Sequence, residues 1–160
     1  MTVWVNGCFD LFHVGHLDLL ETATRAAGES ALIVGVNSDE SIRQLKGQGK
    51  PIICLRHRIM ILEALAYVDQ VIVIHGTNCA PELKAIRPDI VLKGKGYTIE
   101  SMCQDERAAV DSYGGQIRFM DRCNYPISTS EIIHRAATYH ALTNQPFIDE
   151  SEKPLANYSI

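Results

Sequence analysis

The sequence predicts a single doubly wound α/β domain, with a central parallel sheet and helices on both faces. Short apolar runs rich in β-branched residues recur along the chain, as expected for strands that are covered on both faces. Segments with apolar residues at helical spacing separate these runs. The length of 160 residues, 46% of them hydrophobic, suits one hydrophobic core.

The first two predicted elements are a strand and a helix. The run TVWVNGC, residues 2–8, is apolar and β-branched and contains Asn-Gly, which predicts a strand that leads into a loop. From Val14 onward apolar residues recur at helical spacing until Gly28, so we expect a helix over 14–27.

The later elements continue this alternation. We expect strands at residues 31–40, 70–75, 89–94 and 116–120. We expect helices at about residues 56–66, 81–86, 100–113 and 128–140, and a loop rich in Gly and Lys at 45–51. Strands that alternate with helices indicate a Rossmann-like sheet, in which ligands bind beyond the carboxyl ends of the strands.

The C-terminal tail differs from the rest of the chain. Residues 144–160 contain two prolines and no periodic pattern of apolar residues. We therefore expect a domain over residues 1–143 and a C-terminal extension over 144–160 that is extended or partly disordered.

Composition excludes several classes of partner. A net charge of -4 gives no general reason to bind nucleic acid or an anionic membrane surface. No apolar run approaches the roughly 20 residues that span a bilayer, and the N-terminus does not resemble a signal peptide. The five cysteines are scattered and form no CxxC pair, which argues against disulfides and against a zinc site. We expect a cytoplasmic protein with reduced thiols, no metal ligands, no nucleic acid partner and no membrane association.

The stretch NGCFDLFHVGH, residues 6–16, is the strongest candidate for a site. It leaves the first predicted strand and begins the first helix, where free N–H groups and the helix dipole favour an anion. Gly7 and Gly15 let the backbone approach a ligand closely, and His13 and His16 can donate to phosphate oxygens. Two alternatives stay open: ordinary half-buried turn residues, or a metal pair, which would need further ligands that the spacing does not supply.

The same stretch resembles a signature of the nucleotidyltransferases related to cytidylyltransferases, G-x-F-D-x-x-H-x-G-H. Six positions match, namely Gly7, Phe9, Asp10, His13, Gly15 and His16. The resemblance extends to about His140 and includes the segments VNSDESIRQLKGQGKPI, LRHRIMILEALAYVDQVI, RPDIVLKGKGY and ISTSEII. Within this superfamily the chain is most similar to the heptose 1-phosphate adenylyltransferase domain of ADP-heptose synthesis, and next to glycerol-3-phosphate cytidylyltransferase.

This resemblance implies a reaction. The phosphate of an acceptor would attack the α-phosphate of a nucleoside triphosphate in line and release pyrophosphate, without a covalent enzyme intermediate. It also implies Mg²⁺ bound with the nucleotide, a homodimer, and catalytic roles for His13, His16, Lys46 and Arg58. Such a transfer mainly requires the protein to position the two substrates and to supply positive charge.

The resemblance also implies two sets of binding residues. The nucleotide set consists of Gly7, Cys8, Phe9, Asp10, His13, Gly15, His16, Lys93, Gly94, Ser128, Thr129 and Ser130. The acceptor set consists of Lys46, Arg58, Lys93 and Tyr97, and we add Lys95 of the same loop, although it departs from the family pattern.

Each role has a structural alternative. Lys46 can be a solvated lysine of a flexible loop, and Arg58 can form a structural ion pair. Asp10 can orient an imidazole or a Mg²⁺-bound water, or it can cap the backbone of the loop. Ser128 and Glu131 form an S-x-x-E capping box that would begin a helix without any ligand.

Departures from the family pattern concern the acceptor. The heptose family usually has two glycines and an aspartate after the lysine of the substrate loop, whereas LKGKGY has Lys95 and Gly96 at the last two places. Pro126 stands where a glycine is common.

The sequence leaves three candidate functions open. The first is a sugar-phosphate nucleotidyltransferase, with adenylyl transfer favoured. The second is a CTP-dependent enzyme for glycerol 3-phosphate or another small phosphorylated alcohol, and the third is a nucleotide-binding regulator without turnover.

Overall fold

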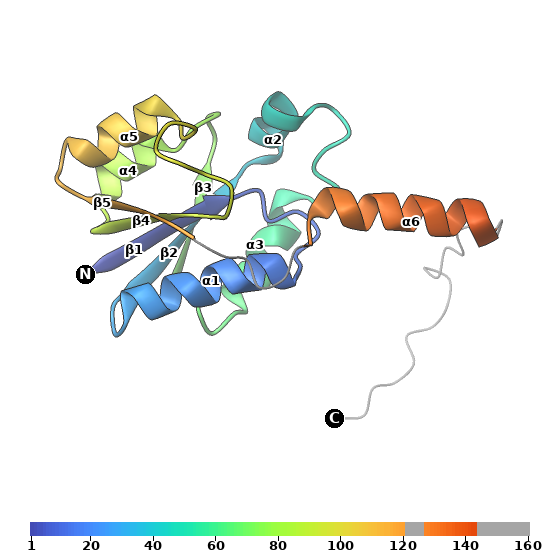
Figure 1. Ribbon diagram of the computed structural model, residues 1–160, viewed down its shortest axis with the longest axis horizontal. Coiled ribbons are helices and arrows are strands. Elements are labelled where there is room, and N and C mark those ends of the chain that lie inside the picture. The colour runs from blue at the N-terminus through green and yellow to red at the C-terminus, as the bar shows by residue number, and fades with distance from the viewer. Residues whose placement is uncertain (121–126, 144–160) are drawn as a thin grey trace. The chain divides into compact units, whose positions relative to one another are not determined.

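The computed structural model describes residues 1–120 and 127–143, which fall into two compact units, Met1–Ile127 and Ser128–Ile160. The first unit contains a parallel sheet of five strands in the order β3-β2-β1-β4-β5 (Figure 1). The strands are β1 (Thr2–Gly7), β2 (Ala31–Asn37), β3 (Gln70–Ile74), β4 (Ile90–Lys93) and β5 (Gln116–Phe119). The helices of this unit are α1 (Val14–Ala27), α2 (Asp39–Lys46), α3 (Leu55–Glu63), α4 (Ala80–Ile86) and α5 (Gln104–Asp111).

Two hydrophobic cores lie on opposite faces of this sheet. On one face Val3 and Val5 of β1 pack with residues of α1 and α3, such as Leu20 and Leu62. On the other face Trp4 packs with residues of α4 and α5. Neighbouring residues of one strand thus point into different cores, as the period of two in a strand requires. The predicted doubly wound α/β fold is confirmed.

The strand order reverses between β1 and β4, since β2 and β3 follow β1 to one side and β4 and β5 lie on the other. Ligands of such sheets bind in the crevice outside the carboxyl ends of the strands at this reversal. Gly7 and Lys93, the last residues of β1 and β4, mark that place.

Helix α2 is an element that our sequence prediction missed. We expected a strand to residue 40 and a loop from residue 45, but Asp39–Lys46 is helical. The Ser38 hydroxyl accepts a hydrogen bond from the amide of Ser41, and Gly47, with a φ of 94°, ends the helix. The correction changes the setting of Lys46, which ends a helix and does not begin the flexible loop.

The second unit contains helix α6 (Thr129–Thr143), in which no residue is buried. The compact units divide at 127/128, and the domain boundary that we expect at residue 143 stays a prediction. The predicted extension, 144–160, and Pro126 lie outside the described residues. Among the helices that the structure describes, none combines the length and the apolar character needed to cross a membrane.

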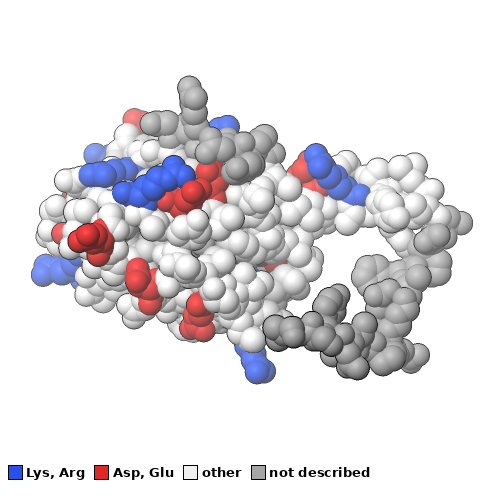
Figure 2. Space-filling view, turned by 90° about the horizontal axis from the view of Figure 1, so that it is seen from below, with Lys and Arg blue, Asp and Glu red and all other residues white. Residues whose placement is uncertain are grey.

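The charged side chains are mixed on the face that Figure 2 presents. Lys and Arg groups lie beside Asp and Glu groups there, and no continuous basic band is visible on this face. This agrees with the net charge of -4.

The contact between Gly35 and Trp4 gives a stability prediction. A Cβ at Gly35, in the middle of β2, would lie 2.6 Å from Cη2 of Trp4 and 2.8 Å from Cδ1 of Ile74. Because both side chains are fully buried, we expect Gly35→Ala to lower the free energy of unfolding by about 1–3 kcal/mol. Denaturation in urea measures the change. Gly49→Ala is the control, since a Cβ there meets nothing within 4 Å; equal stability of both variants would contradict the prediction.

Candidate active site

A cavity of about 450 Å³ opens at the carboxyl ends of β1, β2 and β4. Eight residues of the predicted site line it: Gly7, Cys8, Phe9, His16, Lys46, Lys93, Gly94 and Tyr97. They come from segments far apart in the sequence, and the reversal of strand order brings them together.

The two histidines of the signature cap helix α1 in a reciprocal arrangement. His13 is the N-cap residue, and its Nδ1 accepts from the amide of Gly15 at 3.1 Å. Nδ1 of His16 accepts from the amide of His13 at 3.4 Å. An Nδ1 that accepts carries no proton, so in each neutral ring the proton lies on Nε2. The helix cap therefore determines which nitrogen can donate to a ligand.

The ring of His16 is held in place by other aromatic rings. His13 stacks on it with ring centroids 3.8 Å apart and an interplanar angle of 19°. Phe9 and Phe12 lie 5.3 and 5.5 Å from it, centroid to centroid. His16 lines the cavity, while His13 supports it from the helix cap. The two residues thus have different positions although the signature treats them alike.

The environment keeps these imidazoles neutral. Burial, the His13 ring and the charge of Lys46 lower the pKa of His16 to about 3, against the opposing effect of Asp10. Burial also lowers the pKa of His13. A neutral His16 offers one Nε2–H as a hydrogen-bond donor near pH 7.

This shift predicts acid sensitivity. Between the usual value of 6.5 and the folded value of about 3, the unfolded chain binds more protons at His16, so stability falls as pH decreases from 6.5. We expect His16→Asn to remove up to about 1.4 kcal/mol per pH unit of this loss. Urea denaturation at pH 7, 5.5 and 4.5 measures both slopes. Identical slopes for the variant and the wild type would refute the assignment.

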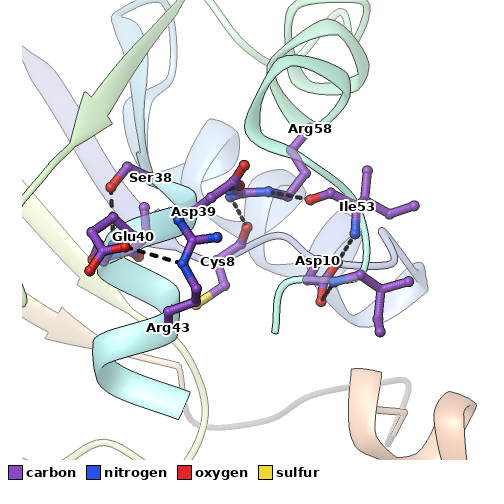
Figure 3. Close-up of polar contacts among 11 residues, drawn as sticks. Cys8, Asp10, Ser38, Asp39, Glu40, Arg43, Ile53 and Arg58 are labelled. Carbon is purple, nitrogen blue, oxygen red and sulfur yellow. Dashed lines mark hydrogen bonds and ion pairs between the residues drawn. The ribbon is translucent and has the colours of Figure 1, made fainter. Parts of the chain in front are cut away.

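In the structure Asp10 caps the backbone of a loop, which is one of the roles expected for it from the sequence. Its carboxylate accepts from the amides of Ile52 and Ile53 at 2.9 and 2.8 Å, which fastens the segment before α3 to the signature loop (Figure 3). Asp10 also raises the pKa of His16 through its charge. It is 4% exposed and does not line the cavity.

Arg58 forms buried polar contacts within the protein, which is the structural alternative that the sequence left open. The residue is 1% exposed, and its guanidinium donates to the carbonyl oxygens of Cys8 and Ile53, at 2.6 and 2.9 Å, and to the carboxylate of Asp39 at 2.8 Å (Figure 3). It does not line the cavity. A planar fork of five N–H donors is suited to joining three segments in this way. In this geometry Arg58 supports the loop that carries Cys8, and its catalytic and acceptor-binding roles stay predictions.

Two lysines bring positive charge to the cavity from different elements. Lys46, exposed at the end of α2, lies close enough to His16 to lower its pKa. Lys93, at the end of β4, is 5% exposed. Its Nζ donates to Glu106 at 2.6 Å and to Asn6 at 3.0 Å, and it lies 5.9 Å from the centre of the Tyr97 ring.

Other predicted site residues lie elsewhere. The amide of Gly15 donates to the capping side chain of His13. Lys95 is exposed and absent from the described lining of the cavity. In the second unit the Ser128 hydroxyl accepts from the amide of Glu131 at 3.1 Å, as the capping box predicts. The Glu131 carboxylate, however, pairs with Arg135 at 2.7 Å. Roles of Ser128, Thr129 and Ser130 toward a nucleotide stay predictions.

Sequence reasoning missed several lining residues, namely Asn6, Leu19, Asn37, Leu45, Thr77, Cys103 and Glu106. The rule of strand ends could have found Asn6 and Asn37, because both lie at the ends of strands. No signal in the sequence indicates Glu106, which reaches the cavity from α5. Among residues 1–120 and 127–143 no group of three or more His, Cys, Asp or Glu side chains could hold a metal ion.

Comparison with known proteins identifies the family. Residues 4–135 match the family model described as cytidylyltransferase-like. The chain belongs to the cytidylyltransferase-like family. The resemblance seen in the signature is thereby confirmed.

Relatives of this cytidylyltransferase-like protein include the "Bifunctional protein HldE" of Alcanivorax borkumensis, 41% identical over 133 residues that make up 83% of this chain and 27% of that protein. HldE of Methylococcus capsulatus is 43% identical over 74% of this chain and 24% of that protein. The chain thus spans about a quarter of the length of these relatives. A lipopolysaccharide core biosynthesis protein from Thermoplasma volcanium shares the fold, with a TM-score of 0.60, 24% identity, and coverage of 74% of this chain and 93% of that one.

Proposed function

We propose that this protein transfers a nucleotidyl group, with adenylyl favoured, from a nucleoside triphosphate to the phosphate of a heptose 1-phosphate-like sugar. An oxygen of the acceptor phosphate forms the new bond to the α-phosphorus. The bond from the α-phosphorus to the bridging oxygen breaks, and pyrophosphate leaves with the electron pair. Phosphoryl-type transfers of this kind need positioning and compensation of negative charge.

The observation that carries this proposal is the position of His16 beside Lys46 in a cavity at the reversal of strand order. The Nε2–H of His16 is oriented by the helix cap and can donate to an oxygen of the α-phosphate. The N-terminus of α1 adds its dipole at the same place. Lys46 supplies a compact positive charge for the phosphates that leave.

Magnesium enters this reaction as part of the nucleotide substrate. The residues described offer no cluster of three ligands for a resident ion, and Mg²⁺ typically binds through phosphates and few carboxylates. When bound, the ion supplies charge neutralisation of the phosphate oxygens.

The identity to HldE proteins supports a sugar phosphate as the acceptor. The alternative acceptor, glycerol 3-phosphate or another small phosphorylated alcohol with CTP, is favoured by one feature, the departure of Lys95 and Gly96 from the heptose pattern. A donor in place of an acceptor group can change which hydroxyl pattern a site tolerates.

Pyrophosphate release tests the proposal. Each nucleoside triphosphate is incubated with Mg²⁺ and a panel of sugar 1-phosphates, heptose 1-phosphate included, or with glycerol 3-phosphate. We expect release with ATP and heptose 1-phosphate. Release only with CTP and glycerol 3-phosphate would support the alternative. Nucleotide binding without release across the panel would indicate a regulator and contradict the proposed reaction.

We further propose a homodimer, on the basis of the family resemblance. Sedimentation equilibrium should yield twice the mass of one chain of 17.8 kDa. A monomer at micromolar concentrations would contradict this expectation.

A further inference from the structure

We propose that Glu106, together with Asn6, is a positioning residue that holds the Lys93 ammonium at the cavity so that its third N–H takes a phosphate oxygen of a substrate. This inference rests on the proposed function and deepens it. It adds two residues that neither the signature nor the comparisons assign, and it gives Lys93 a defined geometry.

The contacts of Lys93 carry the inference. An ammonium group has three N–H donors, and two of them are directed to Oε2 of Glu106 and Oδ1 of Asn6. All three residues line the cavity. One donor of a nearly buried cation is thus left for a molecule that enters the cavity.

The residues that hold Lys93 are themselves held. Oδ1 of Asn6 also accepts from Nε1 of Trp4 at 3.3 Å. Oε1 of Glu106 accepts from the amide and from Sγ of Cys79, each at 3.1 Å. Side chains from β1, β4 and α5, with the residue before α4, therefore determine the position of Nζ. A donor that is already fixed loses little conformational entropy when it binds a ligand.

Charge explains why a carboxylate is needed. Burial acts to raise the pKa of Glu106, but the ammonium of Lys93 and the hydrogen bonds from Lys93 and Cys79 outweigh it, and the pKa is lowered. The pair is therefore ionic near pH 7. A buried ion pair contributes little to stability compared with apolar residues of the same volume, so its place beside the cavity favours a role toward a ligand.

Without the carboxylate, Lys93 would be a buried cation with no anionic partner, and burial would favour its neutral form. The other groups that face it are Asn6 of β1, Cys79 before α4 and Tyr97 after β4, while Lys46 and His16 line the same cavity. None of these carries a carboxylate, and Glu82 of α4, whose charge acts on the Cys79 thiol, forms no hydrogen bond or ion pair with Lys93 in the part of the chain that the structure describes. Loss of Glu106 should therefore make phosphate binding depend on pH.

The experiment measures dissociation constants by calorimetry, separately for ATP and for mannose 1-phosphate, at pH 6.5, 7.5 and 9. The dissociation constant of each variant is divided by that of wild type at the same pH. For Glu106→Gln we expect binding of one ligand to weaken about 10- to 100-fold at pH 9, the range for a charged hydrogen bond, and to recover at pH 6.5. Lys93→Met should weaken the same ligand at every pH. The affected ligand identifies which phosphate Lys93 contacts.

Two further variants separate positioning from folding. The double variant Lys93→Met with Glu106→Gln removes both charges, so it should fold and bind as weakly as Lys93→Met at every pH. Asp105→Asn is the matched control, because it removes an exposed charge from the same first turn of α5 and should bind as wild type.

A Glu106→Gln ratio that stays below about twofold at every pH, or a double variant that binds both ligands as wild type, would overturn the inference. If Glu106→Gln does not fold, the double variant decides. Wild type that binds these ligands but releases no pyrophosphate in the panel above would contradict the proposed reaction alone. Wild type that binds neither would contradict both.

Discussion

Replacing His16 by Asn should lower kcat by about 100- to 1000-fold, the usual cost of removing one well-placed donor to a developing negative charge. The variant keeps an oxygen near the position of Nδ1, which can still accept from the amide of His13. It lacks a group at the position of Nε2. The helix cap is thus preserved while the proposed contact with the α-phosphate is lost.

Initial rates of pyrophosphate release measure the effect, and circular dichroism shows whether the fold is retained. His16→Gln is the matched control, because its amide nitrogen can reach the position of Nε2 and should restore part of kcat. If His16→Asn retains more than about a tenth of the wild-type kcat, a loss far smaller than expected for such a donor, the proposed contact is wrong.

Replacing Arg58 by Met should lower the free energy of unfolding by about 3 kcal/mol, the lower end of the range for breaking a buried pair. The change leaves two carbonyl oxygens, of Cys8 and Ile53, without their donor. The carboxylate of Asp39 is 30% exposed, so water compensates part of its loss. For a chain of this length the melting temperature should fall by about 6–12 °C.

Thermal unfolding measures this shift, and Arg107→Met is the matched control. Arg107 lies 3.8 Å from Asp111 on the surface of α5, with 45% of its side chain exposed, and its loss should change stability by less than about 0.5 kcal/mol. If Arg58 only binds substrate, Arg58→Met should lose activity and keep the melting temperature of wild type. That outcome would contradict the structural role and support the role predicted from the sequence.

The fold was predictable because each element carries a strong local pattern. The strand 31–37 is apolar up to its last residue, Asn37, and Gly28 marks the end of the first helix. Helix α2 was missed because it is short, with eight residues, and mostly polar, and only Ser41 and Ile42 of its residues are buried. Its capping residues, Ser38 and Gly47, were the available signal.

The candidate site was predictable where the signature specifies residues, and less so where function depends on partners. The sequence alone could not decide between the two roles of Arg58, because its partners lie 5, 19 and 50 positions away along the chain. Nor could it assign Glu106, which reaches Lys93 only after α5 has packed on the sheet.

The sequence by itself determined the fold class, the family and the residues at the N-terminus of the first helix. Each of these depends on patterns among residues that are close together along the chain. Tertiary structure decided which nitrogen of His16 is free to donate, that Arg58 supports a loop, and that Lys93 is held by Glu106 and Asn6. The physical reason is that hydrogen bonds and burial depend on distances between segments. Such distances exist only once the strand order β3-β2-β1-β4-β5 has been formed.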